Sequence, residues 1–139
     1  MQHQFPITIY HNSSCETSQN VLSAILASGY SPHIIHYLDI GWKIQELQEL
    51  FAAAQLTPRQ AMRETKSPAQ ELGLLNLGVS DSMILNEMCK YPILVNRPFV
   101  KTPKGVKLCR PSEIVFELLD RFPQEPLYKT DGQLMVLPQ

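Results

Sequence analysis

Residues 7–22 read ITIYHNSSCETSQNVL, and this stretch decides the fold. It opens inside a β-branched and aromatic run, Phe5–His11, that predicts a strand. After a short polar loop, apolar residues recur at helical spacing until Gly29, namely Val21, Leu22, Ile25 and Leu26. HIIHYL at 33–38 then predicts a second strand. Strand, helix and strand in this order form a βαβ unit, which implies parallel strands joined by a right-handed crossover.

Residues 40–92 carry no strand signal. WKIQELQELFAAAQ at 42–55 places its apolar residues on one helical face, which predicts an amphipathic helix. Three further helices are predicted over TPRQAMRET (57–65), SPAQELGL (67–74) and SDSMILNEMCKYP (80–92). We therefore expect a helical insertion between two parts of a sheet.

Strand patterns return after the insertion, in ILV (93–95), FVKT (99–102) and VKLCR (106–110), with a turn at PKG. PSEIVFELLDRF (111–122) predicts a closing helix. The order βαβ, helices, ββα resembles the thioredoxin-like fold, an α/β class with a mixed sheet. We expect one domain over 1–139. It comprises a core of about 5–39 and 93–122, a helical insertion of about 40–92, and a lightly docked tail of 123–139.

Composition limits the class of protein. The 139 residues carry a net charge of -1, so no overall positive field favours nucleic acid or anionic lipid. Three cysteines without a CxxC suggest neither a disulfide framework nor a zinc ribbon, and favour a reducing cytoplasm. The N-terminus lacks signal-peptide features, and no run of about 20 apolar residues predicts a membrane span. We expect a soluble, cytoplasmic monomer without nucleic-acid or membrane partners.

Cys15 stands in the polar loop at the start of the first predicted helix. Unpaired N–H groups and the helix dipole stabilise an anion there, so the pKa of a thiol can fall well below its usual value of about 8.5. Ser13 and Glu16 have the spacing of a capping box, which would place Cys15 in the first helical turn. The alternative, a buried core cysteine, is disfavoured by the polar neighbours. Cys15 is thus the candidate nucleophile.

Two neighbours of Cys15 could tune the thiol. His11 ends the first predicted strand and could balance a thiolate, while Ser18 lies one helical turn beyond Cys15 and offers a hydroxyl. A histidine hydrogen-bonded at a strand end and an ordinary helix serine remain open alternatives. His33 and His36 could complete a metal site with His11 and Cys15, but they face opposite sides of a strand, so we expect no metal.

Three arginines are candidates for binding an oxyanion, because the planar guanidinium fork pairs with two oxygens at once. Arg97 precedes Pro98, at the place where thioredoxin-like folds hold a cis peptide facing the catalytic loop, so this bond is predicted to be cis. Arg110 ends the last core strand, and Arg63 lies in the insertion. Each arginine alone could be a solvated surface residue, so the interpretation depends on all three converging.

Four segments, YHNSSCETS (10–18), AMRET (61–65), PILVNRPFV (92–100) and KLCRPSEIV (107–115), together resemble the glutaredoxin-coupled arsenate reductases. The resemblance covers residues 7–119. It implies a thioredoxin-like fold with a helical insertion, no bound cofactor, and reduction of arsenate to arsenite with glutathione as co-substrate and glutaredoxin as partner. It also assigns roles: Cys15 is the nucleophile, His11 and Ser18 tune it, and the oxyanion is held by Arg63, Arg97 and Arg110.

The loop departs from the family pattern at three positions, where Ser13 replaces a proline, Glu16 a glycine and Gln19 an arginine. Glu16 brings a negative charge next to Cys15, which opposes a low thiol pKa, and Gln19 removes a nearby positive charge. We expect these changes to affect the catalytic rate rather than the type of reaction.

Neither of the other two cysteines is placed to resolve an intermediate on Cys15. Cys109 neighbours Arg110 on a predicted strand and so faces the opposite side, and Cys89 is predicted to be a core residue of the insertion. An external thiol must then complete the reduction. Two alternatives remain: a regulator of the Spx type that binds RNA polymerase, which would carry CxxC where this chain has CETS, and a glutathione-linked oxidoreductase-like protein without arsenate activity.

Overall fold

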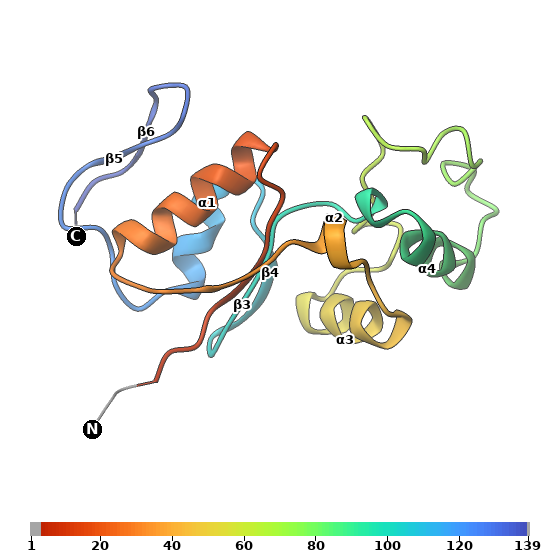
Figure 1. Cartoon of the computed structure of the whole chain (residues 1–139), viewed down its shortest axis with the longest axis horizontal. Helices are drawn as coiled ribbons and strands as arrows, with labels where there is room; N and C mark the ends of the chain where they lie inside the picture. Colours follow the sequence, from red (N-terminus) through yellow and green to blue (C-terminus); the bar gives the residue numbers. More distant parts are fainter. Residues whose placement is uncertain (1–3, 139) are drawn as a thin grey trace. The chain divides into compact units, whose positions relative to one another are not determined.

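The computed structural model describes residues 4–138 and divides them into two compact units. The described residues up to His36 and those from Arg97 onward form one unit, here called the sheet unit, and Tyr37–Asn96 form the other, the helical unit (Figure 1). The helical unit is therefore inserted between two segments of chain that fold together. The expectation that the whole chain acts as a single domain stays a prediction.

The sheet unit contains a four-stranded mixed sheet in the order β2-β1-β3-β4. Its strands are β1 (Thr8–Tyr10), β2 (His33–Ile35), β3 (Phe99–Thr102) and β4 (Gly105–Leu108). β1 pairs parallel with β2 and antiparallel with β3, and β3 pairs antiparallel with β4. This arrangement confirms the predicted α/β class and its βαβ start. The second strand is shorter than predicted, because the chain turns into helix α2 at Tyr37.

Helix α1 (Glu16–Ala27) and the 3₁₀ helix η2 (Ser112–Leu118) pack together with one face of this sheet (Figure 1). The core between these elements consists of apolar side chains, among them Ile9, Val21, Ile25, Val100, Val115 and Leu118. Burying these side chains is the main favourable term in holding the elements together. Every one of these elements except η2 has the type that the sequence predicts.

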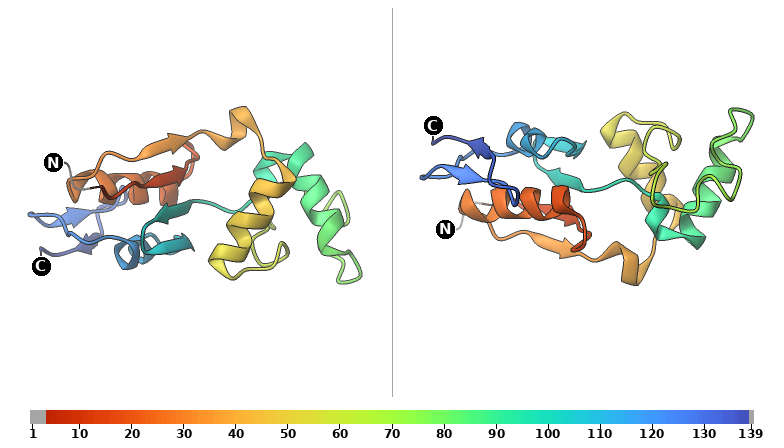
Figure 2. Two further views of the ribbon diagram at one scale, coloured as in Figure 1. Left: turned by 90° about the horizontal axis from the view of Figure 1, so that it is seen from below. Right: turned by 90° about the horizontal axis from the view of Figure 1, so that it is seen from above.

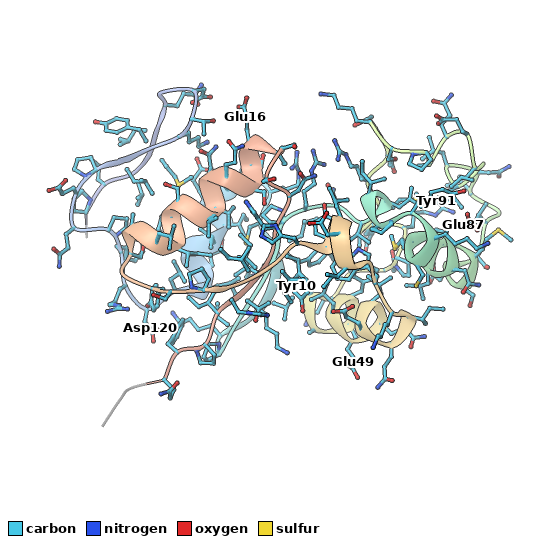
Figure 3. The ribbon with its side chains drawn as sticks, viewed as in Figure 1. Tyr10, Glu16, Glu49, Glu87, Tyr91 and Asp120 are labelled. Atoms are coloured by element: carbon cyan, nitrogen blue, oxygen red, sulfur yellow. The ribbon has the colours of Figure 1, made fainter. Side chains whose placement is uncertain are left out.

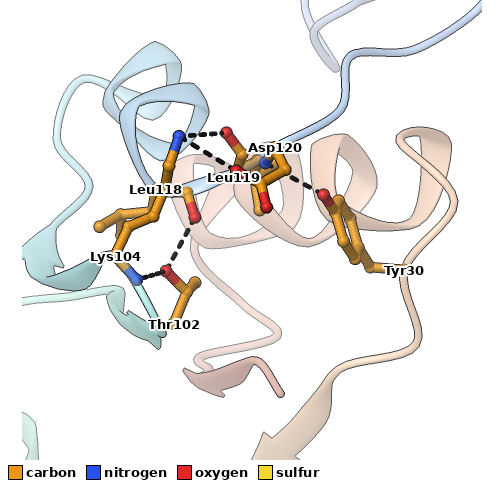
Figure 4. Close-up of polar contacts among 6 residues, drawn as sticks. All are labelled: Tyr30, Thr102, Lys104, Leu118, Leu119 and Asp120. Atoms are coloured by element: carbon orange, nitrogen blue, oxygen red, sulfur yellow. Dashed lines mark hydrogen bonds and ion pairs between the residues drawn. The ribbon is translucent and has the colours of Figure 1, made fainter. Parts of the chain in front are cut away.

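The predicted α-helix over 111–122 is wrong, since η2 is a 3₁₀ helix that ends at Leu118. Side chains from the β3–β4 hairpin donate hydrogen bonds to the carbonyl groups at the end of η2 (Figure 4). Thr102 Oγ1 donates to the carbonyl of Leu118 at 2.8 Å, and Lys104 Nζ donates to that of Leu119 at 3.1 Å. The last carbonyl groups of a helix need hydrogen-bond donors, and here tertiary contacts supply them.

The helical unit contains α2 (Tyr37–Ile40), α3 (Ile44–Ala54), α4 (Asp81–Lys90) and the 3₁₀ helix η1 (Pro92–Leu94). α3 and α4 confirm two predicted helices. The helices predicted over 57–65 and 67–74 are wrong, because these residues form turns.

The strand predicted over 93–95 is also wrong. These residues belong largely to η1, and only Val95 makes an isolated bridge, with Met62. Beside that bridge, Arg63 N–H donates to the carbonyl of Leu94 and Asn96 N–H donates to that of Ala61. These bonds use backbone groups that a helix over 57–65 would have needed.

The chain ends in a C-terminal hairpin formed by β5 (Leu127–Tyr128), β6 (Leu134–Val136) and the turn between them, and it lies beside α1 (Figures 1 and 2). Met135 is only 7% exposed and joins the core of the sheet unit. Met135 thus gives the tail one apolar anchor, and the expectation of a lightly docked tail stays a prediction. Within residues 4–138, no helix has both the length and the apolar character needed to cross a bilayer.

Candidate active site

Cys15 is the N-cap residue of α1, with an extended backbone (φ -102°, ψ 122°). Its N–H donates to the carbonyl of Asn12 at 3.0 Å, and its carbonyl accepts the N–H of Gln19 at 3.0 Å, the first bond of the helix. The predicted capping box of Ser13 and Glu16 is wrong, because the turn closed by Asn12 delays the helix until Glu16. The thiol itself, 7% exposed, therefore occupies the position where a capping group meets the unpaired N–H groups.

His11 and Ser18 form one buried pair, with His11 Nδ1 2.7 Å from Ser18 Oγ. Ser18 Oγ also accepts the backbone N–H of Asn12 at 3.1 Å, so this hydroxyl connects the end of β1 to the first turn of α1. The pKa of His11 is lowered, first by burial and then by the neighbouring His36, which favours a neutral imidazole. His11 thus reaches the Cys15 loop through Ser18.

Arg97 and Arg110 lie at two cis-proline segments of the sheet unit. The Arg97–Pro98 bond is cis, as predicted, and the Arg110–Pro111 bond is also cis, which the sequence analysis did not predict. Cys109 N–H donates to the carbonyl of Pro98 at 2.9 Å, so the two segments lie side by side. Arg110 Nη1 donates to the carbonyl of Arg97 at 3.1 Å and to Cys15 Sγ at 3.8 Å.

These neighbours set the pKa of Cys15. Burial, the largest single influence, raises the pKa by disfavouring the thiolate. The Ser18 backbone N–H, the charge and hydrogen bond of Arg97, and the hydrogen bond of Arg110 together outweigh burial, so the pKa lies below its ordinary value. Since only the thiolate is nucleophilic, a lowered pKa favours nucleophilic chemistry at Cys15 over a thiol with an ordinary pKa.

The other two cysteines lack this activation, and all three cysteines are free. Cys109 is fully buried, and burial raises its pKa to about 12. Cys89, in the helical unit, is partly exposed rather than a core residue as predicted, and burial and the charge of Glu46 raise its pKa. Neither thiol is primed as a nucleophile.

Arg63 belongs to the helical unit. Its Nε donates to the carbonyl of Thr65 at 3.0 Å, and its own carbonyl accepts the hydroxyl of Ser67 at 2.6 Å. The structure thus assembles His11, Cys15, Ser18, Arg97 and Arg110 within one unit. The assignment of Arg63 to the same site stays a prediction.

Sequence reasoning missed the role of Asn12 in shaping the loop and the contact that Gln19 makes with it. Asn12 Oδ1 accepts the N–H of Ser14 at 3.0 Å, an Asx turn that the pattern Asn-Ser-Ser before a helix could have indicated. Gln19 Nε2 donates to the carbonyl of Ser13 at 2.6 Å, so the residue that replaces the family's arginine still ties the loop to α1. Across residues 4–138, no three His, Cys, Asp or Glu side chains gather where they could hold a metal ion.

The sheet unit has a thioredoxin-like mixed sheet, with a thiol at the start of its first helix and two arginines beside that thiol. These features define a thioredoxin-like protein with a candidate cysteine site. Residues 10–118 match the model of the ArsC family, and the chain belongs to that family. Arsenate reductase ArsI2 of Synechocystis sp. (strain ATCC 27184 / PCC 6803 / Kazusa) is 58% identical over 130 residues, covering 94% of this chain and 93% of that protein. The arsenate reductase of Escherichia coli (strain K12) is 43% identical, covering 94% and 92%.

A solved structure gives the same result. The arsenate reductase from Vibrio cholerae superimposes with a TM-score of 0.80 at 30% identity, over 84% of this chain and all of that one. The predicted resemblance to this family and fold is confirmed.

Proposed function

We propose that this protein is an arsenate reductase that uses Cys15 as its nucleophile and glutathione with glutaredoxin as its source of electrons. The observation that carries the proposal is the contact of Arg110 with the sulfur of Cys15, at the N-terminus of α1, together with the lowered pKa of that thiol. Relatives named arsenate reductase, aligned over 94% of the chain, support the choice of substrate.

In the first step, arsenate binds through its oxygens to Arg97, Arg110 and the free N–H groups of the helix, with Arg63 as a further ligand. The Cys15 thiolate forms a bond to arsenic, and one arsenate oxygen leaves as water after taking up protons. Arsenic remains in the +5 state. The resulting thiol–arsenate ester stays on the enzyme.

In the second step, a glutathione thiolate bonds to the sulfur of Cys15. The electron pair of the S–As bond passes to arsenic, which leaves as arsenite in the +3 state. The two sulfurs are together oxidised by two electrons and form a mixed disulfide. A thiolate of glutaredoxin then attacks the glutathione sulfur and releases Cys15 as a thiolate.

An external thiol is required because the chain offers no suitable second thiol. Cys109 is buried with a pKa raised to about 12, and Cys89 belongs to the helical unit and has a raised pKa. Glutathione, abundant in a reducing compartment, fits that need, and a cytoplasmic monomer is part of the proposal.

The test is arsenate-dependent oxidation of NADPH by the full chain with glutathione, glutaredoxin and glutathione reductase. We expect turnover that requires both glutathione and glutaredoxin. Cys15→Ser should lower it by about three orders of magnitude or more, because an alcohol is a far weaker nucleophile and cannot form the mixed disulfide.

The matched control is the double variant Cys89→Ser, Cys109→Ser, which should keep its activity. If the folded double variant were inactive and wild type turned over with thioredoxin alone, an internal disulfide relay would replace the proposed chemistry. A wild-type chain without any arsenate-dependent turnover would favour the alternative of a glutathione-linked protein lacking this activity.

A further inference from the structure

The C-terminal hairpin contacts both segments that follow the candidate site residues. Cys15 leads directly into the first turn of α1, and Arg110 leads, through Pro111, into η2. Residues 129–133, the turn of the hairpin, make polar contacts with each of these elements. The resemblance that identified the site residues covers 7–119 and leaves this segment without a role.

On the α1 side, Thr130 makes two contacts. Its backbone N–H donates to Oδ1 of Asn20 at 2.9 Å, and Asn20 is itself buried, with 8% exposure. Its hydroxyl donates to Oε1 of Glu16 at 3.4 Å, and Glu16 projects from the first turn of the helix (Figure 3). The hairpin therefore holds the turn that begins immediately after Cys15.

On the η2 side, Lys129 Nζ pairs with Glu113 Oε2 at 2.7 Å. The Lys129 and Glu113 side chains are 19% and 41% exposed. By comparison, Lys107 of β4 pairs with Glu117 of η2 at 3.5 Å, and those side chains are 45% and 59% exposed. A short, partly shielded pair is more strongly attractive than an exposed one. Lys129 thus holds the first turn of η2, three residues after Arg110.

The hairpin is itself held in place by hydrogen bonds within its turn and by a buried side chain, so its contacts can fix the positions of α1 and η2. Lys129 N–H donates to the carbonyl of Gln133 at 2.8 Å and Gly132 N–H donates to that of Lys129 at 2.9 Å, which closes the turn. Gly132 has a φ of 89°, a conformation that glycine adopts without strain. Met135, buried among the core residues, secures the second strand.

We propose that the C-terminal hairpin is a positioning element of the active site: by joining α1 to η2, it keeps Arg110 in contact with Cys15. The proposal rests on the proposed function only in taking Cys15 as the reacting thiol. Thr130, Lys129 and Glu113 act through the segments they hold and touch no reacting atom. The charged groups facing Cys15 are Arg97 and Arg110, with Glu16 next in the chain and His11 acting through Ser18.

The test is the pH profile of Cys15 alkylation by iodoacetamide, followed by mass spectrometry of the Cys15 peptide. Its midpoint reports the stability of the thiolate, and its high-pH plateau reports access to the sulfur. In Glu113→Gln, we expect the midpoint to rise, so that alkylation below it slows about threefold. The matched control is Glu117→Gln, the same change on the same helix, which should leave the midpoint unchanged.

The direction of the shift separates positioning from simple electrostatics. Removing the negative charge of Glu113 should by Coulomb's law alone stabilise a thiolate and lower the midpoint. A rise therefore means that Arg110 has lost its position. An unchanged or lowered midpoint in a folded Glu113→Gln variant would overturn the proposal.

A second pair of variants covers the case in which Glu113→Gln does not fold. Thr130→Val removes the hydroxyl and keeps the backbone N–H, so the midpoint should rise by less, and Thr130→Ser should restore it. Equal alkylation midpoints for Thr130→Val and Thr130→Ser would contradict the proposal that the hairpin positions Arg110 at Cys15. Because alkylation needs no arsenate, a chain that fails to reduce arsenate could still show the shift, so the two proposals fail separately.

Discussion

Arg97 and Arg110 act on the same sulfur from neighbouring segments of the sheet unit. Arg110 contacts the sulfur of Cys15 at 3.8 Å, and Arg97 lowers the thiol pKa by its charge and a hydrogen bond. A guanidinium that stabilises a thiolate is also placed to bind the oxygens of an anion that the thiolate attacks. We therefore expect the same two residues both to stabilise the Cys15 thiolate and to bind the anion that it attacks.

Replacing either arginine should weaken both effects. We expect Arg97→Ala and Arg110→Ala each to lower kcat/KM for arsenate by about ten- to a hundredfold, the size of one charge-assisted hydrogen bond. Each should also raise the midpoint of Cys15 alkylation. Arg→Lys should recover only part of the activity, because the fork geometry is lost.

The control for these variants is Arg121→Ala, since Arg121 stacks over the ring of Tyr30 and donates to the carbonyl of Gly29. It should retain wild-type kcat/KM. Wild-type values in both the Arg97 and Arg110 alanine variants would show that the oxyanion binds elsewhere.

Cys109 leads to a prediction about stability at high pH. Burial raises its pKa in the folded protein to about 12, well above that of an unfolded thiol. Between these two values the folded state holds a proton that the unfolded state has released, so the free energy of unfolding falls as pH rises. The slope from this one group approaches about 1.4 kcal/mol per pH unit.

We expect urea unfolding under reducing conditions to show wild type losing stability more steeply than Cys109→Ala between about pH 9 and pH 11. Near neutral pH, where the thiol is protonated in both states, the two proteins should show parallel pH dependence. Parallel curves over the alkaline range as well would mean that Cys109 ionises freely in the folded protein.

At the scale of elements, the junction of β1 and α1 depends on one hydroxyl. Ser18 Oγ accepts the N–H of Asn12 and pairs with Nδ1 of His11, and Ser18 is fully buried. Ser18→Ala leaves both of these buried groups without that partner. An unsatisfied buried polar group costs about 1–3 kcal/mol.

We therefore expect Ser18→Ala to lower the free energy of unfolding by about 1–3 kcal/mol and to slow arsenate reduction, because the loop that holds Cys15 loses its tie. Ser23→Ala, the same change at an exposed position of α1, should alter neither quantity. Chemical denaturation and steady-state kinetics measure the two effects. A Ser18→Ala variant as stable and as active as wild type would restore the alternative of an ordinary helix serine.

At the scale of the whole molecule, the question is what the helical unit contributes. The resemblance to arsenate reductases assigns Arg63 to oxyanion binding, and this arginine belongs to that unit. We expect Arg63→Ala to lower kcat/KM for arsenate by about tenfold or more. The midpoint of Cys15 alkylation should stay at its wild-type value, since Arg97 and Arg110 are the arginines that lower this pKa.

Arsenate itself provides the second readout. Bound arsenate should slow alkylation of Cys15 in wild type, and Arg63→Ala should need a higher arsenate concentration for the same protection. Protection curves that coincide, with Arg121→Ala as the matched arginine control, would remove Arg63 from the substrate site.

The sequence alone predicted the elements whose residues have strong local preferences. The β-branched run before the loop, the periodic apolar residues of α1, α3 and α4, and the FVKT strand all folded as their patterns indicate. It also singled out Cys15, because the N-terminus of a helix lowers the pKa of a thiol at the junction between a strand and that helix. These features depend on neighbours along the chain, so periodicity and spacing are enough to find them.

Only the tertiary structure decided the features that depend on distant partners. Hydrogen bonds from Thr102 and Lys104 cap the end of η2. Backbone hydrogen bonds to the carbonyls of Leu94 and Ala61 form in place of a predicted helix. Burial of Met135 anchors the tail. The contact between Arg110 and Cys15 joins residues 95 positions apart. Such contacts form because the folded sheet brings these groups together, and no local pattern records which donor will reach which acceptor.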